Sequence, residues 1–96
     1  MDDKAVATAL ARVPGWTRAG RAITRTYHFD DFGGALAFVA RVGEVAEREQ
    51  HHPDIDIRYN QVTLSLWTHD AGGLTERDFR LAAALDADRP PGETRG

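Results

Sequence analysis

Three histidines mark the part of the sequence with the clearest capacity for chemistry. His51 and His52 are adjacent and stand directly before a proline, and His69 follows further along the chain. An imidazole has an unperturbed pKa of about 6.5, so one ring can donate a proton near neutral pH while its neighbour accepts one. Neighbouring imidazoles also discourage double protonation, which keeps one ring neutral and available as a base. A cluster of these side chains would suit acid–base catalysis.

A glutamate precedes the histidine pair at helical spacing. Glu47 and His51 are four residues apart, so on a helix they share one face and their side chains can form a hydrogen bond. His52 lies one residue further, where Pro53 disfavours helical backbone geometry. We therefore expect Glu47 to hold the tautomer of His51, and we expect the two imidazoles to point in different directions.

Plainer interpretations of these residues stay open at this point. A surface His-His pair often has no function at all. The three histidines and the glutamate also carry the donor types that zinc binds, although their spacing matches no known zinc pattern. Trp16 and Trp67 belong to a residue type found more often in cores and interfaces than on ligand platforms.

Composition excludes several other kinds of chemistry. The chain has 96 residues and no cysteine, which rules out disulfides, thiolate catalysis and cysteine-ligated zinc. Ser65 is the only serine and lies in no nucleophile elbow. The glycine pairs at 33–34 and 72–73 lack the rest of a phosphate-binding loop.

Charge and hydropathy argue against a nucleic-acid-binding face and against a membrane segment. Twelve basic and fifteen acidic residues give a net charge of −3, Lys4 is the single lysine, and Lys and Arg do not cluster. The apolar stretches are far too short to cross a bilayer, and the N-terminus lacks the pattern of a signal peptide. We expect a cytoplasmic domain that binds neither nucleic acid nor membrane. A core this thin would gain stability from oligomerisation.

Apolar periodicity and turn residues divide the chain into seven elements. The sequence predicts a helix over 2–13, strands over 16–19 and 21–29, a helix over 32–50, strands over 55–59 and 62–67, and a helix from 75 to about 86. Hairpins joined by helices favour an α+β fold with a four-stranded antiparallel sheet and three helices on one face. The domain is expected to span 1–86. Residues 87–96 are rich in Pro and Gly and are expected to form a disordered tail.

Local patterns predict which side chains are buried. The strand over 21–29 places apolar residues on one face, with Arg25 as the exception. In the last helix, Thr75 and Asp78 match a capping box, which gives Asp78 a structural role without any catalysis. The long helix has an apolar stripe that we expect to be buried, and it comprises Phe32, Leu36, Val39, Val42 and Ala46, widened by Phe38 and Val45.

These residues together give the sequence its resemblance to a known family. Over roughly residues 5–86 it resembles the pterin-4a-carbinolamine dehydratases, whose pattern joins an acidic residue, His-His-Pro, an aromatic residue, a further His and an Asp. In this chain the pattern reads Glu47, His51, His52, Pro53, Tyr59, His69 and Asp78. The stretches 52–60 and 68–75 are similar to bacterial members, and 15–16 and 27–32 also match. Trp67 stands where a small polar residue is expected, and it could alter the rim of the pocket.

The resemblance implies a hydro-lyase. Such enzymes remove water from the 4a-hydroxytetrahydropterin that aromatic amino-acid hydroxylases release, and the quinonoid dihydropterin product is recycled to tetrahydrobiopterin. The reaction needs one proton delivered to the leaving hydroxyl and one removed from the adjacent ring nitrogen, and it needs no metal or organic cofactor. By position, the resemblance implies that His51, His52 and His69 are the catalytic histidines. Our hypothesis is that His51 and His52 share the acid and base roles, while His69 orients the pterin and assists.

The resemblance also implies supporting residues and partners. Glu47 would orient His51, Asp78 would fix the loop of His69, and Trp16 would line the pocket. Further residues expected to bind or support the pterin are Pro53, Thr68 and Asp70. Family members form homodimers or homotetramers, often by pairing edge strands, and are linked functionally to an aromatic amino-acid hydroxylase.

Two alternatives belong to other functional classes. Relatives with this fold serve as dimerisation cofactors or assembly factors, so the chain could be a non-catalytic binding module. A binding module has no need of the complete histidine set, which therefore favours the enzyme. A small metal-binding protein is the other alternative, and it predicts stoichiometric metal after purification.

Overall fold

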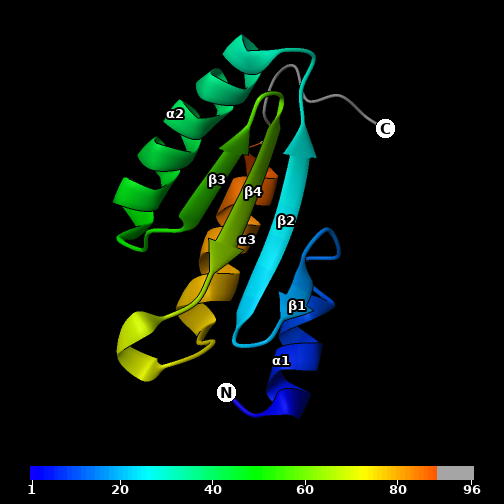
Figure 1. Ribbon diagram of the computed structural model, residues 1–96. Helices are drawn as coiled ribbons and strands as arrows, with labels where there is room; N and C mark the ends of the chain where they lie inside the picture. Colours follow the sequence, from blue (N-terminus) through cyan, green and yellow to red (C-terminus); the bar gives the residue numbers. More distant parts are fainter. Residues whose placement is uncertain (89–96) are drawn as a thin grey trace.

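The computed structural model describes residues 1–88 and shows a four-stranded antiparallel sheet with three helices against one face (Figure 1). The elements run in the order α1 (Asp3–Leu10), β1 (Thr17–Ala19), β2 (Ala22–His28), α2 (Phe32–Glu49), β3 (Asp54–Arg58), β4 (Gln61–Leu66), a 3-10 turn η1 (His69–Ala71) and α3 (Glu76–Ala87). The strand order is β1-β2-β4-β3, so β1 and β3 are the edge strands. The predicted α+β fold is confirmed.

Each helix begins at a residue that the sequence offers as a cap. The carboxylates of Asp2 and Asp31 each accept a backbone hydrogen bond at 2.7 Å, at the starts of α1 and α2. At α3 the N–H of Thr75 donates to Asp78 Oδ2 at 2.9 Å, and the predicted capping box is present. These caps satisfy backbone donors that the first helical turn leaves without partners. Helix α1 is shorter than predicted, because it ends at Leu10 and the chain then turns toward β1.

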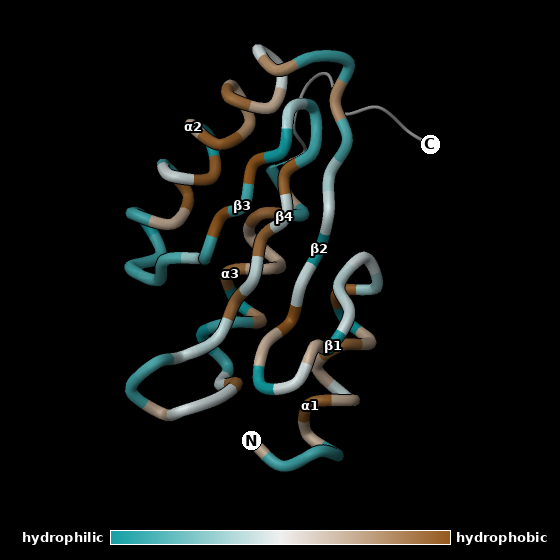
Figure 2. Tube along the Cα trace, viewed as in Figure 1, coloured by the Kyte–Doolittle hydropathy of each residue, from teal (hydrophilic) through white to brown (hydrophobic). Residues whose placement is uncertain are grey.

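The core lies between the sheet and the helices. Strand β4 alternates buried and partly exposed residues, and its buried side faces the helices. Figure 2 shows hydrophobic residues recurring along the helices and along β3 and β4. The large side chains with less than 2% exposure are Tyr27, Phe29, Ile23, Leu64, Leu66, Leu81, Val6, Val13, Val42, Val62 and Asp78. A carboxylate within this set needs partners, and its partners turn out to define the site.

The prediction of the buried stripe on α2 is wrong at its N-terminal end. Phe32 and Leu36 are 46% and 45% exposed, whereas the buried residues of the helix are Ala35, Phe38, Val42, Val45 and Ala46. The helix carries two overlapping apolar faces, and periodicity alone cannot decide which one faces the sheet. The ring of Phe38 lies 4.5 Å from that of Tyr27 and 5.1 Å from that of Phe29, measured between centroids. These aromatic contacts turn the Phe38 side inward and leave Leu36 outside.

Arg25, the exception on the buried face of β2, has a partner on α3. Its Nη1 donates to Asp86 Oδ1 at 2.9 Å, and the same oxygen accepts the indole N–H of Trp16 at 3.0 Å. The Arg25 guanidinium also lies 4.7 Å from the ring centroid of Tyr27. The carboxylate of Asp86 in α3 therefore links Trp16, which directly precedes β1, to Arg25 of β2.

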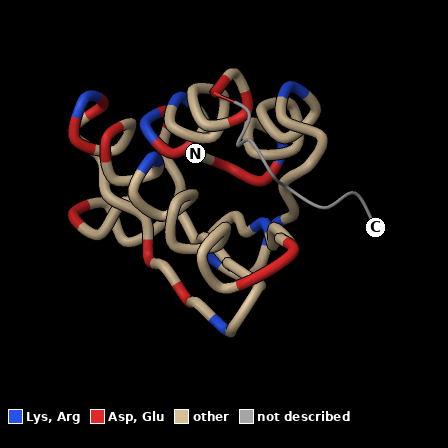
Figure 3. Tube along the Cα trace, turned by 90° about the horizontal axis from the view of Figure 1, so that it is seen from above, with Lys and Arg blue, Asp and Glu red and all other residues tan. Residues whose placement is uncertain are grey.

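The end of the described chain differs slightly from the prediction. Helix α3 continues to Ala87, and Asp88 caps it and pairs with Arg41 of α2. The rest of the predicted tail, 89–96, lies outside the described residues. Basic and acidic residues are interspersed around the fold (Figure 3). Within residues 1–88, no helix has the length and apolar character that crossing a bilayer requires.

Candidate active site

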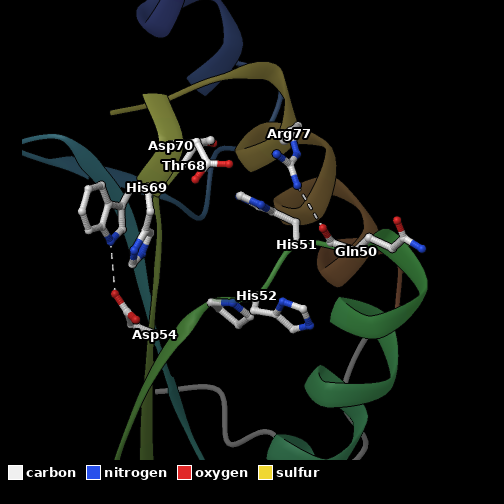
Figure 4. Close-up of a pocket in the computed structure, with 10 residues that line it drawn as sticks. Gln50, His51, His52, Asp54, Thr68, His69, Asp70 and Arg77 are labelled. Atoms are coloured by element: carbon white, nitrogen blue, oxygen red, sulfur yellow. Dashed lines mark hydrogen bonds between the residues drawn. The ribbon is translucent and has the colours of Figure 1, made fainter. Parts of the chain in front are cut away.

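A cavity of about 330 Å³ forms where the end of α2, the end of β4 and the start of α3 meet. Its lining residues are Gln50, His51, His52, Pro53, Asp54, Trp67, Thr68, His69, Asp70 and Arg77. Figure 4 shows His69 on one side of the cavity and His51 on the other. The fold thus brings together all three histidines that the sequence singles out.

His51 enters the cavity because α2 ends just before it. The C-cap residue Gln50 adopts a left-handed conformation with φ of 53°, and the N–H of His51 donates to the carbonyl of Ala46 at 3.1 Å. This turn takes His51 out of the helical phase of Glu47. The predicted Glu47–His51 pair is therefore wrong, and the buried imidazole of His51 points instead toward α3.

Asp78 is the partner of His51 and the centre of the polar network. The His51 Nε2 lies 2.5 Å from Asp78 Oδ1, and Asp78 is fully buried. The other oxygen, Oδ2, accepts hydrogen bonds from the Thr68 hydroxyl and from the Thr75 N–H, both at 2.9 Å. One carboxylate thus caps α3, fixes the residue before His69 and orients His51. Because the carboxylate of Asp78 accepts a hydrogen bond from Nε2–H, the lone pair of a neutral His51 imidazole lies on Nδ1.

Glu47 contacts the second histidine of the pair. The His52 Nε2 lies 2.5 Å from Glu47 Oε2, and the side chains are 67% and 76% exposed. Water screens this pair, so it orients the ring of His52 with little net energy. The two adjacent imidazoles therefore contact different carboxylates: His51 contacts the buried Asp78, and His52 contacts the exposed Glu47.

The side chain of His69 is positioned by contact with an aromatic ring. Its imidazole stacks on the indole of Trp67, with centroids 3.9 Å apart and planes 27° apart. The His69 backbone begins η1, and the loop closes through an isolated bridge between Thr68 and Gly73.

Other predicted site residues divide into two groups. Pro53, Thr68 and Asp70 line the cavity, and Thr68 also supports Asp78. Trp16 does not line it, because its side chain is 3% exposed and belongs to the core near Asp86. The prediction that Trp16 lines the pocket is therefore wrong for the cavity seen in a single copy of the chain.

Sequence reasoning missed three polar lining residues, Gln50, Asp54 and Arg77. Arg77 Nη2 donates to the carbonyl of Gln50 at 3.0 Å, which ties the start of α3 to the end of α2 (Figure 4). The Glu-Arg-Asp segment that starts α3 offered a signal, since neighbours of a capping residue lie near the same helix end. Among residues 1–88, no group of three or more His, Asp or Glu side chains is arranged to hold a metal ion.

Comparisons with known proteins point to one family. Residues 1–87 match the family described as pterin 4 alpha carbinolamine dehydratase. A protein of Thermomicrobium roseum, whose name assigns it provisionally to the pterin-4-alpha-carbinolamine dehydratases, is 56% identical over 85 residues, covering 88% of this chain and 91% of that protein. A similarly named protein of Chloroflexus aurantiacus is 52% identical over 86 residues, covering 90% of this chain and 92% of its own.

Two solved structures share the fold. One is described as a transcriptional coactivator/pterin dehydratase from Brucella melitensis, with a TM-score of 0.83 and 35% identity, and the match covers 91% of this chain and 95% of that one. The other is described as a pterin dehydratase-like RuBisCO assembly factor of the alpha-carboxysome. It has a TM-score of 0.63 and 22% identity over 76% of this chain and 87% of its own, a likeness in fold alone.

Proposed function

Because the chain belongs to the pterin-4-alpha-carbinolamine dehydratase family, we propose that it is a hydro-lyase that converts a 4a-hydroxytetrahydropterin into quinonoid dihydropterin and water. The observation that carries this proposal is the convergence of His51, His52 and His69 on one cavity, with His51 held by the buried Asp78. A binding module of the same fold would not need that convergence.

The reaction breaks one carbon–oxygen bond and moves two protons. A general acid protonates the 4a-hydroxyl so that it leaves as water, and a general base takes the proton from the adjacent ring nitrogen as the carbon–nitrogen double bond forms. We assign these two roles to His51 and His52. His69, across the cavity, orients the pterin ring. We propose that no metal or organic cofactor takes part, since imidazoles can carry both proton transfers.

Asp78 supports the proposed role of His51. A carboxylate that accepts from Nε2–H fixes the ring plane and leaves Nδ1 as the atom that exchanges protons. A hydrogen bond to a charged group contributes about 1.5–3 kcal/mol, enough to hold one orientation. His52 has an exposed carboxylate partner and is freer to exchange its proton with water between turnovers.

We also propose that the protein works as a homodimer or homotetramer. Ile55 and Ile57 pair with Leu64 and Val62 of β4 and so belong to the helix-covered face, yet they are 40% and 37% exposed because β3 is an edge strand. Pairing of β3 with a second copy would bury these residues and satisfy the free edge. The setting we propose is cytoplasmic recycling of a pterin released by an aromatic amino-acid hydroxylase.

The test is a direct rate measurement. A 4a-hydroxytetrahydropterin is generated in place by a hydroxylase, and its dehydration is followed by absorbance with and without this protein. The proposal requires a rate above that of the spontaneous reaction, and this rate must survive treatment with a metal chelator. Equal rates with and without the protein would favour a non-catalytic binding or assembly role.

A further inference from the structure

His69 differs from the other two histidines in what holds its ring. His51 and His52 each contact a carboxylate, whereas within residues 1–88 the imidazole of His69 has its ring contact with Trp67 and no side-chain hydrogen bond. The backbone of His69 is fixed, because the N–H of Gly72 donates to its carbonyl at 3.1 Å. Stacking on the indole face of Trp67 therefore restrains rotation of the imidazole about its side-chain bonds.

The indole of Trp67 is itself held by contacts from β3 and from the turn before β2. Its Nε1–H donates to Asp54 Oδ2 of β3 at 3.2 Å, the hydrogen bond drawn as a dashed line at Asp54 in Figure 4. The guanidinium of Arg21, in the turn before β2, lies 5.5 Å from the indole ring centroid. Trp67 continues β4 and so receives one contact from each side of its strand. An indole held in this way is a fixed surface against which another ring can be oriented.

We propose that Trp67 is the positioning residue of His69, and that Asp54 and Arg21 hold Trp67 in place for this task. The inference rests on the proposed dehydratase function for its consequence in the reaction. Stacking fixes the plane of the imidazole without using either ring nitrogen, so both remain available to the pterin. Hydrogen bonding to a carboxylate, as in His51, would occupy one nitrogen.

Kinetic variants separate positioning from a structural role. Trp67→Phe keeps an aromatic face for His69 but loses the N–H to Asp54, and Trp67→Leu loses the face as well. We expect Trp67→Leu to lower kcat and kcat/KM together by about tenfold with little change in KM, since a misplaced His69 would no longer orient the pterin for the proton transfers. Trp67→Phe should restore most of the loss.

The other tryptophan supplies the matched control. Trp16 lies in the core and not at the cavity, so Trp16→Phe should leave kcat close to that of the unchanged protein. A folded Trp67→Leu protein with unchanged kcat would overturn the inference. A Trp67→Leu protein whose KM rises while kcat stays constant would also overturn it, since that pattern describes a binding wall.

Fluorescence tests the ring contact without any turnover. The chain has two tryptophans, so the Trp16→Phe protein emits from Trp67 alone. The imidazole of His69 lies against this indole with ring centroids 3.9 Å apart, and contact with an imidazole quenches indole emission. The emission of the Trp16→Phe protein should therefore be weaker than that of the Trp16→Phe, His69→Gln protein at the same pH.

The two measurements fail independently. If quenching depends on His69 but the unchanged protein does not accelerate dehydration, the ring contact stands, the dehydratase proposal falls, and the positioning role in that reaction falls with it. If the protein is active but the emission of Trp67 does not respond to His69, the positioning role falls and the proposed function stands.

Discussion

The imidazole of His51 and the carboxylate of Asp78 meet 2.5 Å apart in a buried site, although they are 27 residues apart in the chain. Asp78 belongs to the first turn of α3, and His51 follows the last turn of α2. The contact therefore joins the two helices at the wall of the cavity. It also makes one residue, Asp78, responsible for a helix cap and for the orientation of a proposed catalytic histidine.

The first prediction concerns Asp78→Asn. The amide keeps an acceptor for the cap but can turn its NH2 toward His51, which would move the imidazole proton to Nδ1 and block proton exchange there. We expect kcat to fall by at least about 100-fold in a protein that still folds. Steady-state dehydration kinetics together with circular dichroism measure the two effects separately, and a folded variant with kcat within threefold of the unchanged protein would contradict the role of Asp78.

Glu47→Gln should have a much smaller effect. Glu47 and His52 are both largely exposed, and an exposed pair of this kind contributes about 0–1 kcal/mol, which corresponds to less than about fivefold in rate. The measurement is kcat for Glu47→Gln beside Asp78→Asn under the same conditions. A larger loss in Glu47→Gln than in Asp78→Asn would reverse the order of importance that the structure indicates.

The contacts of Asp86 should contribute to the free energy of unfolding and should have no effect on kcat. Asp86→Ala removes the partner of Arg25 and of the Trp16 N–H, and we expect the free energy of unfolding to fall by about 1–3 kcal/mol. Trp16→Phe removes one hydrogen bond and should cost about 1 kcal/mol. Urea denaturation checks both values. If kcat of a folded Asp86→Ala protein fell tenfold, this network would have a part in the site that the geometry does not indicate.

The edge strand gives a prediction about assembly. Ile57→Lys places a charge on the exposed apolar part of β3, which should prevent pairing with a second copy. Sedimentation velocity should show a shift toward the monomer, whereas Ala7→Lys on the exposed side of α1 should leave the distribution unchanged. A monomeric starting protein, or an unaltered oligomer in Ile57→Lys, would refute the proposed interface.

Much of the fold follows from local sequence signals. Asp31 and Thr75 have the side chains that satisfy backbone donors at a helix start, and the capping box predicted for Thr75 and Asp78 forms. Residues that alternate in β4 are buried in the same alternation, because one face of the sheet is covered. These signals are local, so a single sequence contains them.

The sequence predicted which histidines line the site better than it predicted which carboxylate contacts each histidine. His51, His52 and His69 stand out by type, and they do line one cavity. Which carboxylate meets which imidazole depends on Gln50, whose left-handed backbone breaks the helical phase that would have joined Glu47 to His51. Such a conformation is uncommon for glutamine, and the sequence offers no sign of it.

Long-range burial explains the other errors. Trp16 and Leu36 are both large and apolar, yet Trp16 is 3% exposed and Leu36 is 45% exposed. The difference arises from tertiary contacts: the carboxylate of Asp86 accepts the indole N–H of Trp16, and α2 turns Phe38 instead of Leu36 toward the ring of Tyr27. These contacts join different elements of the fold, so local periodicity could not distinguish the two environments.

The most direct test compares dehydration of a 4a-hydroxytetrahydropterin by the unchanged protein and by a folded His51→Gln, His52→Ala protein. Glutamine at 51 still offers an N–H to the buried Asp78, which protects the fold while removing the proton-exchanging ring. We predict that the unchanged protein accelerates the reaction well above the spontaneous rate and that the double variant loses at least about 100-fold of kcat. A folded double variant that retains the full rate would contradict histidine acid–base catalysis at this site.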